Sequence, residues 1–428
     1  MTEAHSSQMP AVADIMIVGG GMVGSALALG LAQQGWQVVL VEASPLASLQ
    51  TAAQPATGVD DFEPRVSAIS MASQRLLEGL GAWAEVAAGR HCPYQMMAVW
   101  DAEGTGRIEF DAAEMRAEAL GTIVENRHVV RALFNALKVS SATIISGAKV
   151  AGWQAEDPDE REEREEREER EERAHGIRLE DGQYLRARLV VAADGAQSRL
   201  RQLVGLPTRE WDYDQQAIVA TVRSKQVHQY TARQSFSRTG PLALLPLQAD
   251  NGDEHFCSIV WSQDTLEARR LMALDDVAFN AELARAIELP EDSVEAISRR
   301  FAFPLRQRHA MDYTAPGFAL VGDAAHSIHP LAGQGANLGY GDVAVLLEEL
   351  KRARKLGLNP GDALVLGRYQ RRRKSENLAM MAAMEGLKQL FGRDELPLRW
   401  LRNQGMNWLN QLPPLKNRLA AEAMGLKN

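Results

Sequence analysis

Six residues near the start of the chain have the spacing of a phosphate-binding turn. Gly19-Gly20-Gly21-Met22-Val23-Gly24 follows the pattern G-x-G-x-x-G. In this pattern Gly19 permits a tight bend, Gly21 lets the backbone approach a pyrophosphate and Gly24 allows close helix packing. Glu42 comes about 20 residues later, where a carboxylate accepts a hydrogen bond from a ribose hydroxyl. The motif predicts a bound dinucleotide at the start of a helix, where free N–H groups favour anions, and it does not distinguish NAD from FAD.

Two later segments place an aspartate at the end of an apolar run. In residues 193–201, Asp194-Gly195 ends a strand and a basic helix start follows. A simple turn is the alternative here, because Asp-Gly is common in turns. In residues 321–337, Asp323 follows a short apolar strand, and capping of a helix or turn is its alternative role.

The glycine turn lies in a predicted βαβ unit, with strands at 14–18 and 37–42 and an apolar helix at 22–34. A helix carrying Leu76, Leu77 and Leu80 on one face should end at Gly81, and another should run from 129 to 138. Strands are predicted at 142–154, 176–187 and 189–193, with Asp181-Gly182 as a hairpin turn. These elements bring the dinucleotide motifs onto one α/β sheet.

A second layer is predicted between residues 217 and 303. Its strand signals are half-polar and lie at 217–223, 231–236, 242–247 and 256–261, with two helices near 266–273 and 276–287. We expect an inserted antiparallel sheet that roofs a ligand site. A short strand at 320–322, a glycine-rich turn and mostly helix, beginning near Gly335, should complete the chain.

Composition narrows the function classes. The net charge is −9, and residues 156–173 alone carry twelve acidic side chains and five Arg. The rest is nearly neutral, which gives no support to nucleic-acid binding. Within that stretch Glu-Glu-Arg repeats from 162 to 173, which we interpret as an expanded hairpin tip, with a partner contact as the alternative.

Targeting and cysteine signals favour a cytoplasmic protein. Cys92 and Cys257 are the only cysteines and lack metal-ligand spacing, so neither a disulfide framework nor a zinc site is expected. Residues 1–13 lack the pattern of a signal peptide, and no apolar run of about 18 residues occurs. We therefore expect a soluble protein, or one that sits on the inner face of a membrane.

Together the three segments resemble the fingerprints of the para-hydroxybenzoate-hydroxylase class of flavin monooxygenases. Within it the chain is similar to the ubiquinone-biosynthesis hydroxylases from Ile15 nearly to Leu426, and most to the 2-polyprenylphenol 6-hydroxylase type. The likeness includes residues 62–68, 123–126, 257–262 and 326–342. Several members have Asp-x-Arg where this chain has Glu63-Pro64-Arg65, so Arg65 matches the fingerprint and Glu63 departs from it.

The resemblance implies an α/β fold with a Rossmann-like FAD-binding domain, an inserted antiparallel β-sheet substrate domain and a helical C-terminus. The expected boundaries are 13–90, 121–206 and 304–345 for the discontinuous FAD-binding domain, 91–120 and 207–303 for the substrate domain, 346–428 for the helical region and 156–173 for the charged insertion.

The resemblance also implies the cofactor contacts. Arg65 and Asn126 should touch FAD, Asp323 should bond the ribityl chain, and the segment Pro330, Gly333, Gln334, Gly335 and Asn337 should face the flavin ring. A helix starting near Gly335 would present its positive end to the negative charge of reduced flavin. Asp194-Gly195 should help to hold FAD and contact NAD(P)H, for which no second glycine fingerprint of Rossmann type is present.

The implied reaction uses NAD(P)H, FAD and dioxygen to hydroxylate the ring of a polyprenylphenol in ubiquinone biosynthesis. His326 and His329 are candidates for acid and base, because histidine as a residue type suits proton transfer near neutral pH. A phenol largely activates itself, however, so that no catalytic side chain is assigned. Alternatives are another ring position, a same-fold isoprenoid reductase and a non-catalytic flavoprotein scaffold. A homo-oligomer remains open.

The C-terminal region is interpreted as helix packing. Arg371-Arg372-Arg373-Lys374 should be a solvated helix face, with a membrane patch as the alternative. Met380, Met381 and Met384 should pack in the core. A last amphipathic stretch should be buried between helices, with a membrane or partner contact as the alternative. Its apolar and basic residues are Leu396, Leu398, Trp400, Leu401, Trp408 and Leu409 with Arg393, Arg399 and Arg402.

Overall fold

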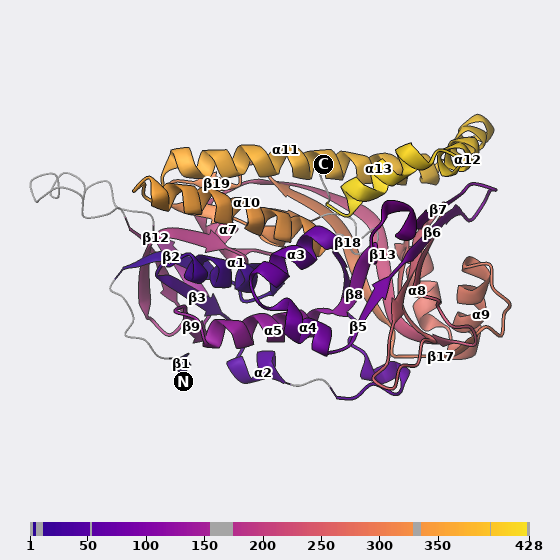
Figure 1. Ribbon diagram of the computed structural model, residues 1–428, viewed down its shortest axis with the longest axis horizontal. Helices are drawn as coiled ribbons and strands as arrows, with labels where there is room; N and C mark the ends of the chain where they lie inside the picture. Colours follow the sequence, from indigo (N-terminus) through magenta and orange to yellow (C-terminus); the bar gives the residue numbers. More distant parts are fainter. Residues whose placement is uncertain are drawn as a thin grey trace, which may run out of the picture.

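The computed structural model describes residues 3–5, 12–51, 54–154, 174–327, 335–393 and 395–425. The Glu-Glu-Arg repeat, His329, Pro330, Gly333 and Gln334 lie outside these residues. Two large sheets lie side by side, and the C-terminal helices run across one face of the molecule (Figure 1). The structure thus has the mixed α/β architecture that the sequence predicted.

The first sheet has the order β1-β9-β3-β2-β12-β11-β10. β2 (Ala13–Val18), β3 (Val38–Glu42) and the second half of β12 (Tyr184–Ala192) are parallel, and β20 (Phe318–Leu320) pairs with β12 in the same direction. Parallel strands are expected to be apolar throughout because both of their faces are covered. The remaining strands are β1 (Glu3–His5), β9 (Thr143–Ser146), β10 (Val150–Gln154), β11 (His175–Leu179) and β19 (Thr314–Ala315).

Helices cover the first sheet and bury its core. α1 (Met22–Gln33) packs against α5 (Asn126–Lys138) and α10 (Gly335–Lys355). Around them lie α2 (Leu46–Gln50), α3 (Met71–Gly79), α4 (Trp83–Ala88), α7 (Arg199–Val204) and the short 3-10 turns Val59–Asp61 and Gly322–Ala324. A small sheet of β4 (Val66–Ser70), β8 (Gly121–Glu125) and β5 (His91–Tyr94) joins this unit to the second sheet.

The second sheet has the order β21-β18-β13-β16-β15-β14-β6-β7, with β17 beside β13. It is antiparallel except where β14 pairs with β6. α8 (Thr265–Ala273) and α9 (Asp276–Ala286) cover its outer face through a separate apolar core. Its strands are β6 (Met96–Asp101), β7 (Arg107–Asp111), β13 (Thr208–Ser224), β14 (Thr231–Ser237), β15 (Gly240–Leu247), β16 (Phe256–Asp264), β17 (Val294–Ile297), β18 (Phe301–Ala310) and β21 (His326–Ser327). A further 3-10 turn spans Ala113–Met115.

Several predicted element bounds were wrong for identifiable reasons. The strand predicted at 142–154 is two strands, because Gly147 has a φ of +71° between them. The segment predicted at 176–187 forms β11 and the start of β12 on either side of its Asp181-Gly182 turn, and the separate strand predicted at 189–193 is the second half of β12. The strand predicted at 320–322 ends at Leu320, since Gly322 begins a 3-10 turn with a φ of +60°.

The C-terminal helices are α11 (Ala363–Gly392), α12 (Leu396–Asn410) and α13 (Pro413–Ala423). Figure 1 shows α11 extending from above α10 toward α12 and α13 beside the second sheet. Among the described helices, none is long and apolar enough to cross a membrane. α11 therefore spans both sheets, and its inner face can take part in a site between them.

α12 presents the opposite face from the one expected. Trp400 and Trp408 are each 66% exposed, whereas Arg402 and Asn403 are buried. Arg402 forms an ion pair with Asp101 at 2.6 Å, and Asn403 accepts a hydrogen bond from the backbone of the β6–β7 turn. The expected burial of these tryptophans between helices was wrong, because polar contacts to the sheet orient the helix.

Candidate functional site

The first glycine turn packs tightly on one side and is open on the other. A Cβ on Gly19, whose φ is +108°, would lie 2.3 Å from the backbone oxygen of Ala193 at the end of β12. A Cβ on Gly24 would lie 1.9 Å from the oxygen of Gly19. A Cβ on Gly21, in contrast, meets no atom within 4 Å. Gly19 and Gly24 are thus required by packing, while Gly21 leaves room for a ligand.

Glu42 ends β3 beside this turn. Its Oε2 accepts a hydrogen bond from the Gly20 N–H at 2.5 Å, and its Oε1 accepts one from the Ser44 N–H at 2.7 Å. A carboxylate has further lone pairs that can accept from a ribose hydroxyl. Besides the expected ribose contact, Glu42 therefore fixes the glycine turn itself, a role that the sequence motif did not reveal.

Asp194 and Gly195 follow β12 on the same edge of the sheet. One Asp194 oxygen accepts hydrogen bonds from the N–H groups of Arg199 and Leu200 at 2.9 and 3.2 Å, so that it caps α7. The other oxygen is buried and has no protein partner among the described residues. Gly195 has a φ of +81° and open space at its Cβ position. The two interpretations of Asp194-Gly195, as a turn and as a ligand contact, are therefore compatible.

Buried Arg201 ties this second segment to the third. Its guanidinium donates to the carbonyl oxygens of Ala196 at 3.1 Å and Ala324 at 2.7 Å. Ala324 follows Asp323 in the 3-10 turn after β20. The two segments, far apart in sequence, thus lie together at the carboxyl ends of parallel strands, where open α/β sheets bind ligands.

Asp323 is exposed to solvent but has protein close beside it. The surrounding protein desolvates its side chain enough to raise the pKa of its carboxyl above the usual value. Positive charge on His326 and Arg65 opposes that rise. A carboxyl that is open to solvent but has protein around it is placed to accept from a ligand hydroxyl.

Arg65 and Asn126 are brought together by the pairing of β4 with β8. The Asn126 N–H donates to the Arg65 oxygen at 3.0 Å, and its Oδ1 accepts from the Ser67 hydroxyl at 2.7 Å. Glu63, where the chain departs from the fingerprint, accepts from the Arg127 N–H at 2.9 Å and so caps α5. The departure therefore has a structural role beside Arg65.

Asn337 lies in the first turn of α10 and holds β4. Its Oδ1 accepts from the Ser70 N–H at 2.9 Å, and its Nδ2 donates to the Ala68 oxygen at 2.8 Å. Gly335 begins the helix and has open space at its Cβ position. The N-terminal end of α10 and the strand after Arg65 thus meet at one place.

His326 belongs to a buried cluster centred on Asp342. The Asp342 carboxylate, fully buried in α10, contacts His326 Nε2 at 2.7 Å, the Gly322 N–H at 2.9 Å and Arg373 Nε at 2.7 Å. Asn377 Nδ2 also approaches it at 3.3 Å. His326 is therefore placed to position the turn that carries Asp323. Sequence reasoning missed the roles of Asp342 and Arg373. In the basic run expected to be solvated, Arg371 and Arg372 are exposed, but Arg373 is buried.

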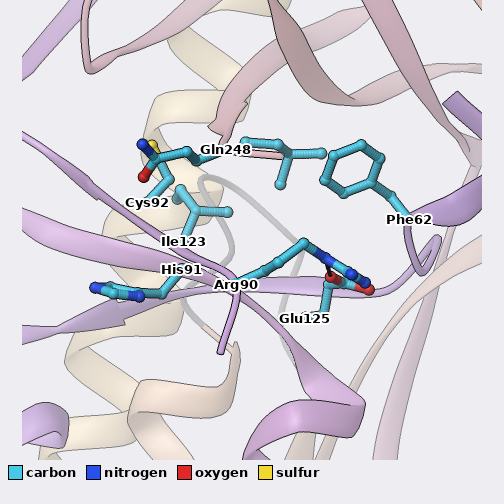
Figure 2. A pocket seen from close by; sticks show the side chains of 8 residues that line it. Phe62, Arg90, His91, Cys92, Ile123, Glu125 and Gln248 are labelled. Carbon is cyan, nitrogen blue, oxygen red and sulfur yellow. Dashed lines mark hydrogen bonds and ion pairs between the residues drawn. The ribbon is translucent and has the colours of Figure 1, made fainter. Parts of the chain in front are cut away.

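A second buried polar cluster lies at the end of β8, around Glu125, and sequence reasoning missed it as well. The Arg90 guanidinium donates to Glu125 at 2.7 Å and to Asp250 at 2.9 Å, and it lies 5.5 Å from the ring centroid of Phe62. Figure 2 shows the Arg90 and Glu125 side chains pointing toward each other beside Phe62. Cys92 lines the same small cavity, and burial raises the pKa of its thiol to about 12, so that it is a poor nucleophile.

These features fit a bound dinucleotide. α1 has no side-chain cap on its N-terminus, Gly21 leaves open space, and Asp194 keeps a buried acceptor without a protein donor among the described residues. Free N–H groups at a helix start bind phosphate, and the two carboxylates Asp194 and Asp323 suit hydroxyl groups. The arrangement can hold a cofactor along the edge of the first sheet.

Comparison with known proteins gives the family. The sequence model of the protein family described as FAD binding domain matches residues 12–382. The 3-demethoxyubiquinol 3-hydroxylase of Escherichia coli (strain K12) is 38% identical, with 96% of this chain and 98% of that protein covered. The ubiquinone hydroxylase UbiL of Rhodospirillum rubrum is 35% identical over 97% and 90%, respectively. The ubiquinone biosynthesis monooxygenase COQ6, mitochondrial, of Homo sapiens is 32% identical over 96% and 92%.

Solved structures agree on the fold. The p-nitrophenol 4-monooxygenase PnpA from Pseudomonas putida DLL-E4 superposes with a TM-score of 0.74 at 19% identity, covering 96% of this chain and 98% of that one. PqsL, a probable FAD-dependent monooxygenase from Pseudomonas aeruginosa, has a TM-score of 0.69 at 23% identity over 92% and 99%. At these identities the likeness establishes the architecture alone.

Proposed function

The chain belongs to the FAD-binding-domain family, among its ubiquinone-biosynthesis hydroxylases, and from this membership we propose that it hydroxylates the aromatic ring of a polyprenylphenol. The observation that carries the proposal is the 38% identity to a ubiquinone-pathway hydroxylase over 96% of the chain. NAD(P)H is the co-substrate typical of this class. The balanced reaction takes phenol, dioxygen, NAD(P)H and a proton to the hydroxylated phenol, NAD(P)⁺ and water.

The residues of the chain have distinct roles in this proposal. The turn from Gly19 to Gly24 and the start of α1 would hold the pyrophosphate, and Glu42 the ribose. Arg65, Asn126, Asp194 and Asp323 would hold the rest of FAD. When bound and reduced, FAD supplies the electrons that activate dioxygen.

The side chains of the protein chiefly orient the phenol ring and exclude water from it. The N-terminus of α10 would present its positive dipole end to the negative charge of reduced flavin. His326 acts through Asp342 as a positioning residue, because its Nε2 bonds that buried carboxylate. An electron-rich phenol needs no strong base, so that excluding water and fixing the ring are the main tasks left to side chains.

Two observations favour different positions of hydroxylation on the ring. The sequence motifs are most similar to the 2-polyprenylphenol 6-hydroxylase type. The E. coli relative is a 3-demethoxyubiquinol 3-hydroxylase, and its identity over nearly the whole chain favours that position as the second candidate. Quinone analysis of cells lacking the protein separates them, because each position leaves a different intermediate.

The decisive experiment measures coupled turnover. Purified protein with FAD, NAD(P)H and a prenylated phenol should consume oxygen and form the hydroxylated phenol in equal amounts. An isoprenoid reductase would show no substrate-dependent oxygen uptake, and a scaffold protein would keep its flavin oxidised. Either result would overturn the proposal.

We also propose a cytoplasmic location with contact to the inner face of a membrane. The exposed Trp400 and Trp408 of α12 support it, because such side chains favour the interface of a bilayer. Co-sedimentation with vesicles should fall in the double variant Trp400→Ser/Trp408→Ser. An oligomer that dissociates in the same variant would favour a contact between copies instead.

A further inference from the structure

A long groove lies between four helices beside the candidate site. It has a volume of about 680 Å³ and is lined by one face each of α3, α10, α11 and α13. Leu76, Ala344, Met384 and Leu419 represent these four walls. The volume is that of a ligand site rather than a packing defect.

One end of the groove reaches the candidate site. Ser70 and Asn337 both line it, and they are joined by the 2.9 Å hydrogen bond that holds β4 to the start of α10. α10 starts at Gly335, which the fingerprint places at the flavin. The groove therefore opens beside Gly335 and Asn337, which the resemblance assigns to the flavin ring.

The other end reaches the surface. Leu387 on α11 and Leu419 on α13 line the groove and are 37% and 45% exposed. Met384 lines it too, and it packs against Phe236 of the second sheet and Phe391. From Arg373 to Leu387 the wall on α11 extends about 21 Å at the rise of an α-helix. The groove thus runs from the site to this surface and is open to solvent along α11, where Ala379 and Ala383 are exposed as well.

The walls suit a flexible apolar chain. On α11, Ala379 and Ala383 alternate with Met380 and Met384, so that small side chains leave space and the methionines adapt to a ligand. The half-buried Met380 and Met384 were expected in the core, but only Met381 is buried there. The positive charge of Arg373 is paired with Asp342 and Glu376, and so it is not available to an anion.

We propose that this groove binds the isoprenoid tail of the substrate, with the ring toward Asn337 and the tail leaving between Leu387 and Leu419. The inference rests on the proposed function, which supplies a ligand with an apolar chain. Each buried methylene-sized group contributes about fourfold in affinity. The groove would therefore select long-tailed phenols over short ones.

The test compares two neighbouring alanines of α11. Ala383→Trp fills the groove, whereas Ala382→Trp changes an exposed residue that does not line it. For a long-tailed phenol, Ala383→Trp should raise the dissociation constant and KM at least tenfold. Binding and coupled hydroxylation of a phenol with one isoprene unit should stay within twofold of wild type, and Ala382→Trp should match wild type with both compounds.

Binding to the oxidised protein is measured apart from hydroxylation, which separates this inference from the proposed function. Equal effects of Ala383→Trp on both phenols, or no effect on either, would overturn the tail site while wild-type hydroxylation stands. Tail-dependent binding without hydroxylation in wild type would instead overturn the function. If Ala383→Trp does not retain FAD, Ala379→Leu is the smaller change on the same wall, and a photoreactive tail should label α11 at Met380 or Met384.

Discussion

Replacing Asp342 with asparagine should destabilise the protein strongly, because one carboxylate serves four donors. Its two oxygens face Gly322 N–H and His326 on one side and Arg373 and Asn377 on the other. An asparagine keeps one oxygen, and its amide N–H₂ then points at donors. A buried donor without an acceptor costs about 1 to 3 kcal/mol. Two such losses agree with the roughly 3 to 5 kcal/mol for breaking a buried ion pair.

The same site predicts a pH dependence. Burial raises the pKa of the Asp342 carboxyl, but the charges and hydrogen bonds of His326 and Arg373 lower it by more, so that it lies below the ordinary value. A group with a lowered folded pKa stabilises the protein above its unfolded pKa, and this contribution is lost as pH falls through the folded pKa. Asp342→Asn should remove that part of the acid sensitivity.

Urea unfolding at fixed FAD concentration measures the effect at pH 7 and at lower pH. Asp312→Asn is the matched control, because Asp312 is 53% exposed and lies 3.7 Å from Lys374; its effect should stay within about 0.5 kcal/mol. The FAD dissociation constant of Asp342→Asn should also rise, since Gly322 positions Asp323. A change in unfolding free energy below 1 kcal/mol for Asp342→Asn would refute the reasoning.

Three further changes test other parts of the site and fold. Gly21→Leu should fold but lose bound FAD, whereas Gly24→Ala should unfold because its Cβ would lie 1.9 Å from a backbone oxygen; circular dichroism and flavin absorbance separate the two, and an unfolded Gly21→Leu would contradict the open space there. Asp323→Ala should raise the FAD dissociation constant about tenfold to a hundredfold, as expected from losing roughly 1.5 to 3 kcal/mol, and an unchanged value would make Asp323 structural. Arg402→Met should cost about 3 to 5 kcal/mol by leaving a buried aspartate unpaired, whereas Trp400→Ser on the exposed face should be near neutral; similar urea midpoints for both would show that the orientation of α12 is misjudged.

The elements that the sequence predicted best are those with local signals. The glycine turn, its flanking strands and α1 follow from an apolar pattern and a motif within about 30 residues. The Asp181-Gly182 hairpin was confirmed for the same reason. Such features depend on residues that are close in the sequence, so that one sequence is enough to predict them.

The features that escaped prediction depend on distant partners. The first half of β13 is mostly exposed and charged, so that it lacks alternation, and its pairing with β18 forms it. Arg373 belongs to a run of four basic residues that was expected to be solvated. It is buried because it bonds Asp342, which lies 31 positions away in the sequence. The predicted domain boundaries and cofactor contacts stay predictions.

The position of β20 in the first sheet has a consequence for how the chain is made. β12 has β2 on one side; on the other side β11 pairs with its first half and β20 with its last residues, and β20 is synthesised only after nearly all of the second sheet. A growing chain therefore carries residues 190–192 of β12 unpaired on this side until residue 320 has left the ribosome, and unpaired strand edges invite association with other strands. The second sheet, from β13 to β18, can complete its long hairpins during this interval. The proposed FAD contacts at Asp323 and the start of α10 also follow β20 in the chain, so that loading of the cofactor would be a late event in biogenesis and bound flavin would report finished chains.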